Sequence, residues 1–168
     1  MSSASTLPYA RDALVTKLTN RAGLSTVNVS RELPRRESDV QSDAGAWESI
    51  WIGRDGAQDA EFDAMQPFLT AGAPRWAEEY TLWSTIQVLK TQSGDTLNDA
   101  EDRAWALAYE FVGAVSADLT LGVSITGEVL MFEVRTIEFV DAGRFLDKAG
   151  AGHQLQIGLN CYGRLRIT

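Results

Sequence analysis

The second half of the chain carries three long stretches with strand periodicity and one long stretch with helical periodicity. Apolar and polar residues alternate over Glu79–Lys90, Glu128–Val140 and Gln154–Ile167, which predicts three long strands. Between the first two, Leu97–Leu119 predicts an amphipathic helix whose core stripe is Ala100, Ala104, Leu107, Ala108, Phe111, Val112 and Val115. Long strands interrupted by one amphipathic helix fold as a sheet with the helix on one face.

The first half of the chain adds a second helix and further strands. A helix is expected over Tyr9–Ala22, because Pro8 stands at its start and Gly23 follows its end. Trp47–Gly53 predicts a strand with its two tryptophans on one face, whereas residues 61–69 fit either a helix or an edge strand. We therefore predict an α+β fold, with an antiparallel or mixed sheet of about four to five strands and two helices packed on one face.

One of the long strands changes its hydrophobic phase. Leu130, Phe132 and Val134 share one parity, but the apolar residues that follow, Ile137 and Phe139, have the other. A shift by one residue moves side chains to the opposite face of a sheet unless the backbone compensates. We therefore predict a β-bulge near Arg135–Thr136.

Length and composition indicate a single domain over residues 1–168, with a flexible N-terminus at residues 1–8 and an extended, polar loop at residues 31–45. The formal net charge of −8 argues against a nucleic-acid-binding surface, which needs clustered Lys and Arg. Cys161 is the single cysteine, so no intrachain disulfide forms, and a reducing cytoplasm is the expected place of folding. No secretory signal is recognisable, and no apolar stretch approaches the roughly 18–20 residues that span a bilayer.

Candidate catalytic and metal-binding residues are few. One histidine and one cysteine cannot build a structural zinc site. We expect His153 to be a solvated residue in the turn before the last strand, and Cys161 to be a buried, unreactive thiol. No phosphate-binding loop or serine nucleophile motif is present. We therefore predict no catalytic residue, no metal site and no cofactor, and expect the chain not to be an enzyme; hydrolysis by a pair of carboxylates is the alternative.

Aromatic residues away from the predicted core are the best candidates for contacts with another protein. Trp83 lies on the polar side of its strand, and Trp105 and Tyr109 lie on a flank of the second helix. Aromatic anchors concentrate binding energy at protein interfaces. We therefore assign these three residues to an interface, with core filling as the alternative for the tryptophans.

Two charged segments are further candidates. The first is the basic run Arg31, Arg35 and Arg36, which we expect to dock on an acidic protein neighbour, with a plain solvated loop as the alternative. The second is an acidic cluster that includes Asp55 and Asp59, for which solvated surface is the simpler interpretation. Its spacing does not fit a calcium-binding EF-hand loop.

The order and spacing of these elements resemble the tail terminator proteins of long-tailed phages that infect actinobacteria. The likeness covers most of the chain. It includes the first helix with Ala13-Leu14-Val15, the strand Glu48–Gly53, the strand start Glu78–Leu82, the Ala- and Glu-rich helix after Gly94-Asp95, and the final strand ending in Arg164-Leu165-Arg166. Head-completion and other neck proteins have similar small folds and are the alternative within the same virion.

The resemblance implies a mixed sheet with helices on one side and no enzymatic activity. It also implies a homo-oligomeric ring, usually a hexamer, that seats on the last ring of the tail tube protein, stops tube polymerisation and gives the head-to-tail connector a docking face. DNA then passes through an acidic lumen without sequence-specific binding, and the protein is located in the tail or neck of the virion. We place the contact between copies on sheet edges and on Trp83, Trp105 and Tyr109. The loop with Arg31, Arg35 and Arg36 and the hairpin with Asp55 and Asp59 are expected to meet the tube or the connector.

Overall fold

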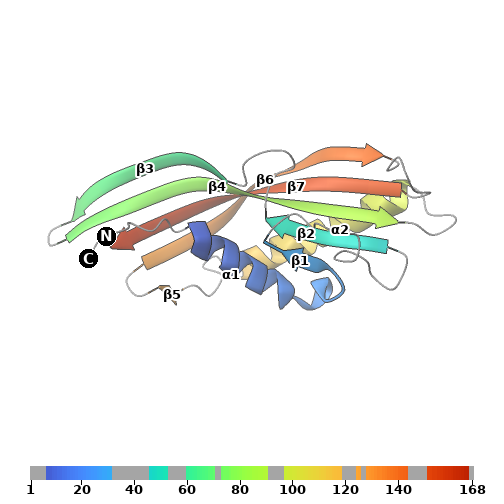
Figure 1. Cartoon of the computed structure of the whole chain (residues 1–168), viewed down its shortest axis with the longest axis horizontal. Helices are drawn as coiled ribbons and strands as arrows, with labels where there is room; N and C mark the ends of the chain where they lie inside the picture. Colours follow the sequence, from blue (N-terminus) through green and yellow to red (C-terminus); the bar gives the residue numbers. More distant parts are fainter. Residues whose placement is uncertain are drawn as a thin grey trace.

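A seven-stranded sheet forms the centre of the computed structural model (Figure 1). The structure describes the backbone of residues 7–31, 46–52, 60–70, 73–90, 97–118, 124–125, 128–143 and 151–166, and the side chains of residues 7–31, 47–52, 80–90, 97–118 and 152–161. In chain order the elements are α1 (Leu7–Thr19), the 3-10 helix η1 (Ala22–Leu24), β1 (Asn28–Ser30), β2 (Ala46–Ile52), β3 (Ala60–Thr70), β4 (Ala73–Lys90), α2 (Leu97–Ala117), β5 (Ser124–Ile125), β6 (Glu128–Gly143) and β7 (Ala151–Arg166).

The strand order is β1-β2-β4-β7-β6-β5, and β3 pairs with β4 outside this path. β1 runs parallel to β2 and every other described pair is antiparallel, so the sheet is mixed. This confirms the predicted α+β class. β1 and β5 are short, with three and two residues. The other five strands of the sheet agree with the predicted number of about four to five. The ambiguous segment at residues 61–69 is a strand, part of β3.

β4 is the longest strand, with 18 residues, or about 60 Å at the usual rise per residue. β7 pairs with it from Arg75 to Lys90. On its other side the partner changes: β2 pairs with Ser84–Lys90, and β3 pairs with Ala73–Leu82. Figure 1 shows that most of β3, the beginnings of β4 and β6 and the end of β7 extend beyond both helices. We call this part the sheet extension.

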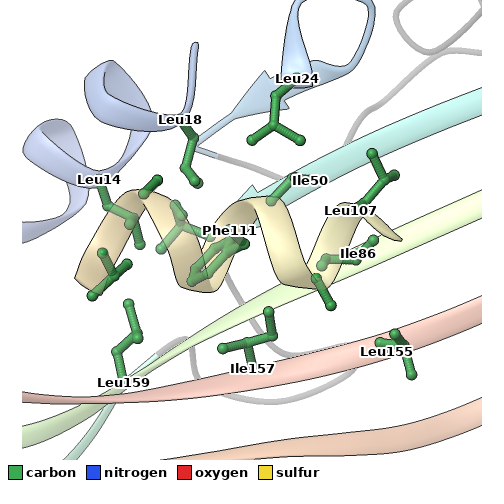
Figure 2. Close-up of a cluster of buried hydrophobic side chains, with 14 of the residues drawn as sticks. Leu14, Leu18, Leu24, Ile50, Ile86, Leu107, Phe111, Leu155, Ile157 and Leu159 are labelled. Atoms are coloured by element: carbon green, nitrogen blue, oxygen red, sulfur yellow. The ribbon is translucent and has the colours of Figure 1, made fainter. Parts of the chain in front are cut away.

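The core lies between α2 and the sheet. In Figure 2, side chains from α1, β2, β4 and β7 converge on α2, with Phe111 at the centre. The predicted helix stripe is confirmed at six positions; Val112 is half-buried instead, and Ala114 takes its place in the core. α1 contributes Ala10, Leu14 and Leu18. It ends at Thr19, earlier than predicted, because the chain continues as the separate turn η1.

The predicted phase slip is confirmed as a register shift in β6 between Val134 and Thr136. Val134 pairs with Leu159, and after the shift Ile137 pairs with Ile157. Both partners on β7 belong to the core under α2. The extra residue therefore keeps apolar positions of β6 paired with core positions of β7 on both sides of the shift. A second shift follows between Phe139 and Asp141, which the hydrophobic pattern does not predict.

Candidate functional site

Trp83 lies on the sheet face opposite α2. It pairs with Gly158 of β7, and since Gly158 has no side chain, the neighbouring strand leaves room for the indole. The side chain is only 6% exposed, and Trp51 on the same face is 3% exposed. Both tryptophans are thus inside the folded chain. The assignment of Trp83 to an interface stays a prediction, and its ring offers a partner little surface in this conformation.

The polar residues beside Trp83 are buried as well. Thr81, Thr85, Gln154 and Gln156 are all buried on the face opposite α2. The Thr81 hydroxyl donates a hydrogen bond to Oδ1 of Asn160, at 3.5 Å. A strict alternation of apolar and polar residues predicts one solvated face. Here the central part of the β4–β7 pair is instead buried on both faces, with neutral polar groups on one of them.

Trp105 and Tyr109 lie together on the outer surface of α2, as the sequence predicts for residues four apart. Their ring centroids are 6.5 Å apart and the planes are inclined by 41°. Trp105 is partly buried and packs against the core, whereas Tyr109 is 70% exposed. Tyr109 is therefore the solvent-exposed member of the pair, and Trp105 lies between the core and the surface.

The charges around this aromatic pair are unevenly distributed on α2. Glu101 and Asp102, one turn before Trp105, are exposed. On the opposite flank of the helix, Arg103 and Glu110 each form an ion pair with a residue outside α2. The aromatic flank of α2 is therefore acidic, while the other flank is electrically balanced.

The ion pairs on the balanced flank fix α2 to the rest of the molecule. The Arg103 guanidinium donates two hydrogen bonds to Glu48 of β2, at 2.7 and 2.6 Å. Glu48 is 8% exposed, and its hydrogen bonding raises the pKa of Arg103. Arg21 donates to Glu110 at 2.8 Å. A two-pronged contact such as Arg103–Glu48 fixes orientation as well as distance, so this pair helps set how α2 lies on the sheet, while Arg21–Glu110 links α2 to the segment after α1.

The predicted basic and acidic segments are only partly described. Arg31 is exposed and pairs with Asp12 of α1 at 3.1 Å. Arg35, Arg36, Asp55 and Asp59 lie outside the described residues. The docking roles assigned to these segments stay predictions.

The prediction for His153 is wrong. β7 begins at Ala151, before the predicted start of the last strand, so His153 lies within the ladder opposite Val88. It is 2% exposed, and desolvation lowers its pKa although Glu101 acts in the opposite direction. Cys161 is buried as predicted, and burial raises the pKa of its thiol.

Among the described side chains, no group of three or more His, Cys, Asp or Glu residues is arranged to hold a metal ion. The helices that the structure describes include none with the length and hydropathy needed to cross a membrane.

Comparison with known proteins finds likeness in structure but not in sequence. A scan against protein-family models finds no match, and a search of curated proteins finds no similar sequence. Among solved structures, a chain of a "Virion of native gene transfer agent (GTA) particle" is 15% identical, with a TM-score of 0.43. The alignment covers 98% of this chain and 100% of that chain.

Proposed function

We propose that this chain is a virion structural protein of a tailed phage, and more specifically a tail terminator. In this role a ring of copies caps the tail tube, stops its polymerisation and provides the face on which the head-to-tail connector docks. The observation that supports the proposal is the pair of open edges of the sheet. Together with the resemblance in sequence order, these edges favour a protein that works by assembly.

The two edges lie on opposite sides of the sheet. β3, with 11 residues, pairs with β4 alone among the described strands. Within the described part of the chain, β6 pairs with β7 on one side and, at Glu128 and Val129, with β5 on the other. Long edges with unpaired N–H and C=O groups are templates for pairing with another chain. Their presence on both sides favours a chain that pairs with neighbours.

The strand directions fit a contact between copies. β3 is antiparallel to β4, β4 to β7, and β7 to β6, so β3 and β6 of one copy run in opposite directions. In a second copy turned about a ring axis, β3 can therefore add to β6 of the first as one more antiparallel strand. Such a contact joins two different surfaces and closes into a ring, for which we propose six copies.

The edges also have features that restrict pairing. Pro67 removes one backbone donor from β3. Register shifts interrupt β3 between Phe62 and Ala64 and β6 at the two places described above. Proline and bulges on edge strands limit indiscriminate association. We propose that they confine pairing to a few segments and so make the contact between copies selective.

We also propose that the chain is not an enzyme and has no cofactor. The two residues with the most versatile side-chain chemistry, His153 and Cys161, are buried in the fold, which supports a structural role for both. The net charge of −8 favours a lumen that DNA passes without sticking. The proposed partners are copies of this chain, the tail tube protein and the connector, and the proposed location is the tail or neck of the virion.

Hydrogen exchange tests the role of the edges directly, because it reports on backbone N–H groups. Native mass spectrometry first identifies the free subunit and the ring, with tail tubes added if the ring forms only on them. Peptides from residues 60–70 and 130–143 should gain protection in the ring, whereas peptides from residues 80–90, already paired on both sides, should change little. A ring that forms without new protection in either edge would contradict the proposed contact.

The particular position in the virion is tested by removing the protein. A phage that lacks a tail terminator should accumulate overlong tails without heads. Full heads that lose DNA would instead favour a head-completion protein on the portal side, the alternative that the resemblance leaves open. Negative-stain images of the particles separate the two outcomes.

A further inference from the structure

The exposed aromatic flank of α2 has a chemistry that sheet pairing does not use. It consists of Glu101, Asp102, Trp105, Tyr109 and Val112, which we call the α2 stripe. Glu101 and Asp102 are adjacent in sequence, and Trp105, Tyr109 and Val112 follow at intervals of three or four residues, so all five lie on one side of the helix. Tyr109 is the most exposed large hydrophobic side chain among the described residues, at 70%. Trp105 supports it from below and is itself held by the core.

The charge of the α2 stripe is of one sign. Glu101 and Asp102 are exposed at its N-terminal end, and the other members of the stripe are uncharged. The nearest base in sequence, Arg103, points to the opposite flank, where Glu48 holds it with two hydrogen bonds. The aromatic pair therefore borders carboxylates, and no cation within the stripe neutralises them.

This combination favours a guanidinium group over other ligands. A guanidinium stacks flat on an aromatic ring through cation–π attraction and, from the same position, donates hydrogen bonds to a carboxylate. A lysine ammonium pairs with the carboxylate but stacks less well. A nucleic acid or an anionic membrane is repelled by the acidic end.

Charge makes a second copy a poor source of that guanidinium, because each copy brings a further net charge of −8. Three of the described arginines, Arg21, Arg31 and Arg103, already form ion pairs within the chain. We infer that the α2 stripe is a docking surface for an arginine-bearing segment of a different protein. This inference does not depend on the proposed function, since it concerns a helix face rather than the sheet edges.

The test uses the full-length protein and two labelled hexapeptides, hexa-arginine and hexa-lysine, which have equal charge. Fluorescence anisotropy at one fixed low ionic strength gives the affinity for each. We expect hexa-arginine to bind more tightly than hexa-lysine. Tyr109→Ala should weaken hexa-arginine binding about two- to fivefold, the range expected for an exposed cation–π contact. The affinities for hexa-arginine and hexa-lysine should therefore become more similar.

Tyr9→Ala is the matched control, because Tyr9 is also an exposed tyrosine, at 44%, on the separate helix α1. It should leave both affinities unchanged. Asp102→Asn should weaken the binding of both peptides, since it removes charge but no ring. An unchanged unfolding midpoint in each variant confirms that the fold is intact, as expected for exposed positions.

Three outcomes would overturn the inference. Equal affinity for the two peptides would mean that charge alone attracts them. Equal effects of Tyr109→Ala and Tyr9→Ala would mean that the α2 stripe is not the binding surface. A Tyr109→Ala variant that alters the native mass of the assembly but not the peptide affinity would assign the stripe to contacts between copies.

Discussion

The ion pair between Arg103 and Glu48 offers a quantitative test of how α2 is held on the sheet. The side chains are 33% and 10% exposed. Breaking a fully buried pair by removing one partner costs about 3–5 kcal/mol, whereas an exposed pair contributes about 0–1 kcal/mol. This pair lies between these limits. We therefore expect Arg103→Met to lower the free energy of unfolding by about 2 kcal/mol, because Glu48 keeps a largely buried charge without its partner.

Removing the charge of the other partner should lower the free energy of unfolding by less. In Glu48→Gln the amide oxygen still accepts one hydrogen bond, and the partly exposed Arg103 can turn toward water. Urea unfolding followed by tryptophan fluorescence, under conditions where the native mass is constant, measures both variants. Lys17→Met is the matched control: the Lys17–Asp118 pair is 3.4 Å long and about equally exposed on both sides, at 34% and 32%. We expect a change below about 0.5 kcal/mol there.

Two results would refute this reasoning. The first is a loss for Arg103→Met no larger than that of the Lys17→Met control. The second is a larger loss for Glu48→Gln than for Arg103→Met, since that order would mean that the arginine and not the carboxylate bears the desolvation cost.

Three further predictions concern the core, the buried histidine and the glycines beside α2. Phe111→Ala, at the centre of the core, should cost about 3–5 kcal/mol in the same urea assay, and a loss below about 1 kcal/mol would contradict the packing described. The lowered pKa of His153 means that the unfolded chain binds a proton more readily, so stability should fall as pH drops below about 6.5. His153→Gln should remove that part of the pH dependence. If plots of unfolding free energy against pH were parallel for the wild type and the variant, His153 would not be its source. A Cβ on Gly23 would overlap the Glu110 carboxyl group, whereas one on Gly113 would meet only the end of Arg21. Gly23→Ala should therefore lower the melting temperature more than Gly113→Ala. At Gly113, within α2, the higher helix propensity of alanine partly offsets the contact.

Local patterns in the sequence were sufficient for several features of the fold. The helical spacing over residues 97–119 predicts the buried stripe of α2, and the parity change after Val134 predicts the β6 bulge. The pairing of Ile50 with Ile86 and of Trp51 with Thr85 confirms the two faces predicted for β2. Each of these features depends on the period of neighbouring residues, which the chain fixes by itself.

Features that depend on distant segments could not be predicted in this way. Phe62, Met65 and Phe68 have helical spacing, but pairing with β4 makes their segment a strand. His153 follows a glycine-rich sequence that suggests a turn, yet the ladder with β4 includes it. The contact between Arg103 and Glu48 joins residues 55 positions apart. Neither residue's immediate sequence indicates that partner.

The change of partner along β4 has a mechanical consequence. Trp83 stands where pairing with β2 ends and pairing with β3 begins. At the same level, β7 has Gly158 and β6 has its first bulge, next to Thr136. Three adjacent strands thus have an irregularity at the same level, and we expect bending of the sheet to concentrate there. We expect the sheet extension to tilt as a plate about that line while the helix-covered half keeps its shape. In the proposed ring, such a joint would let each copy adjust to the curvature of its neighbours.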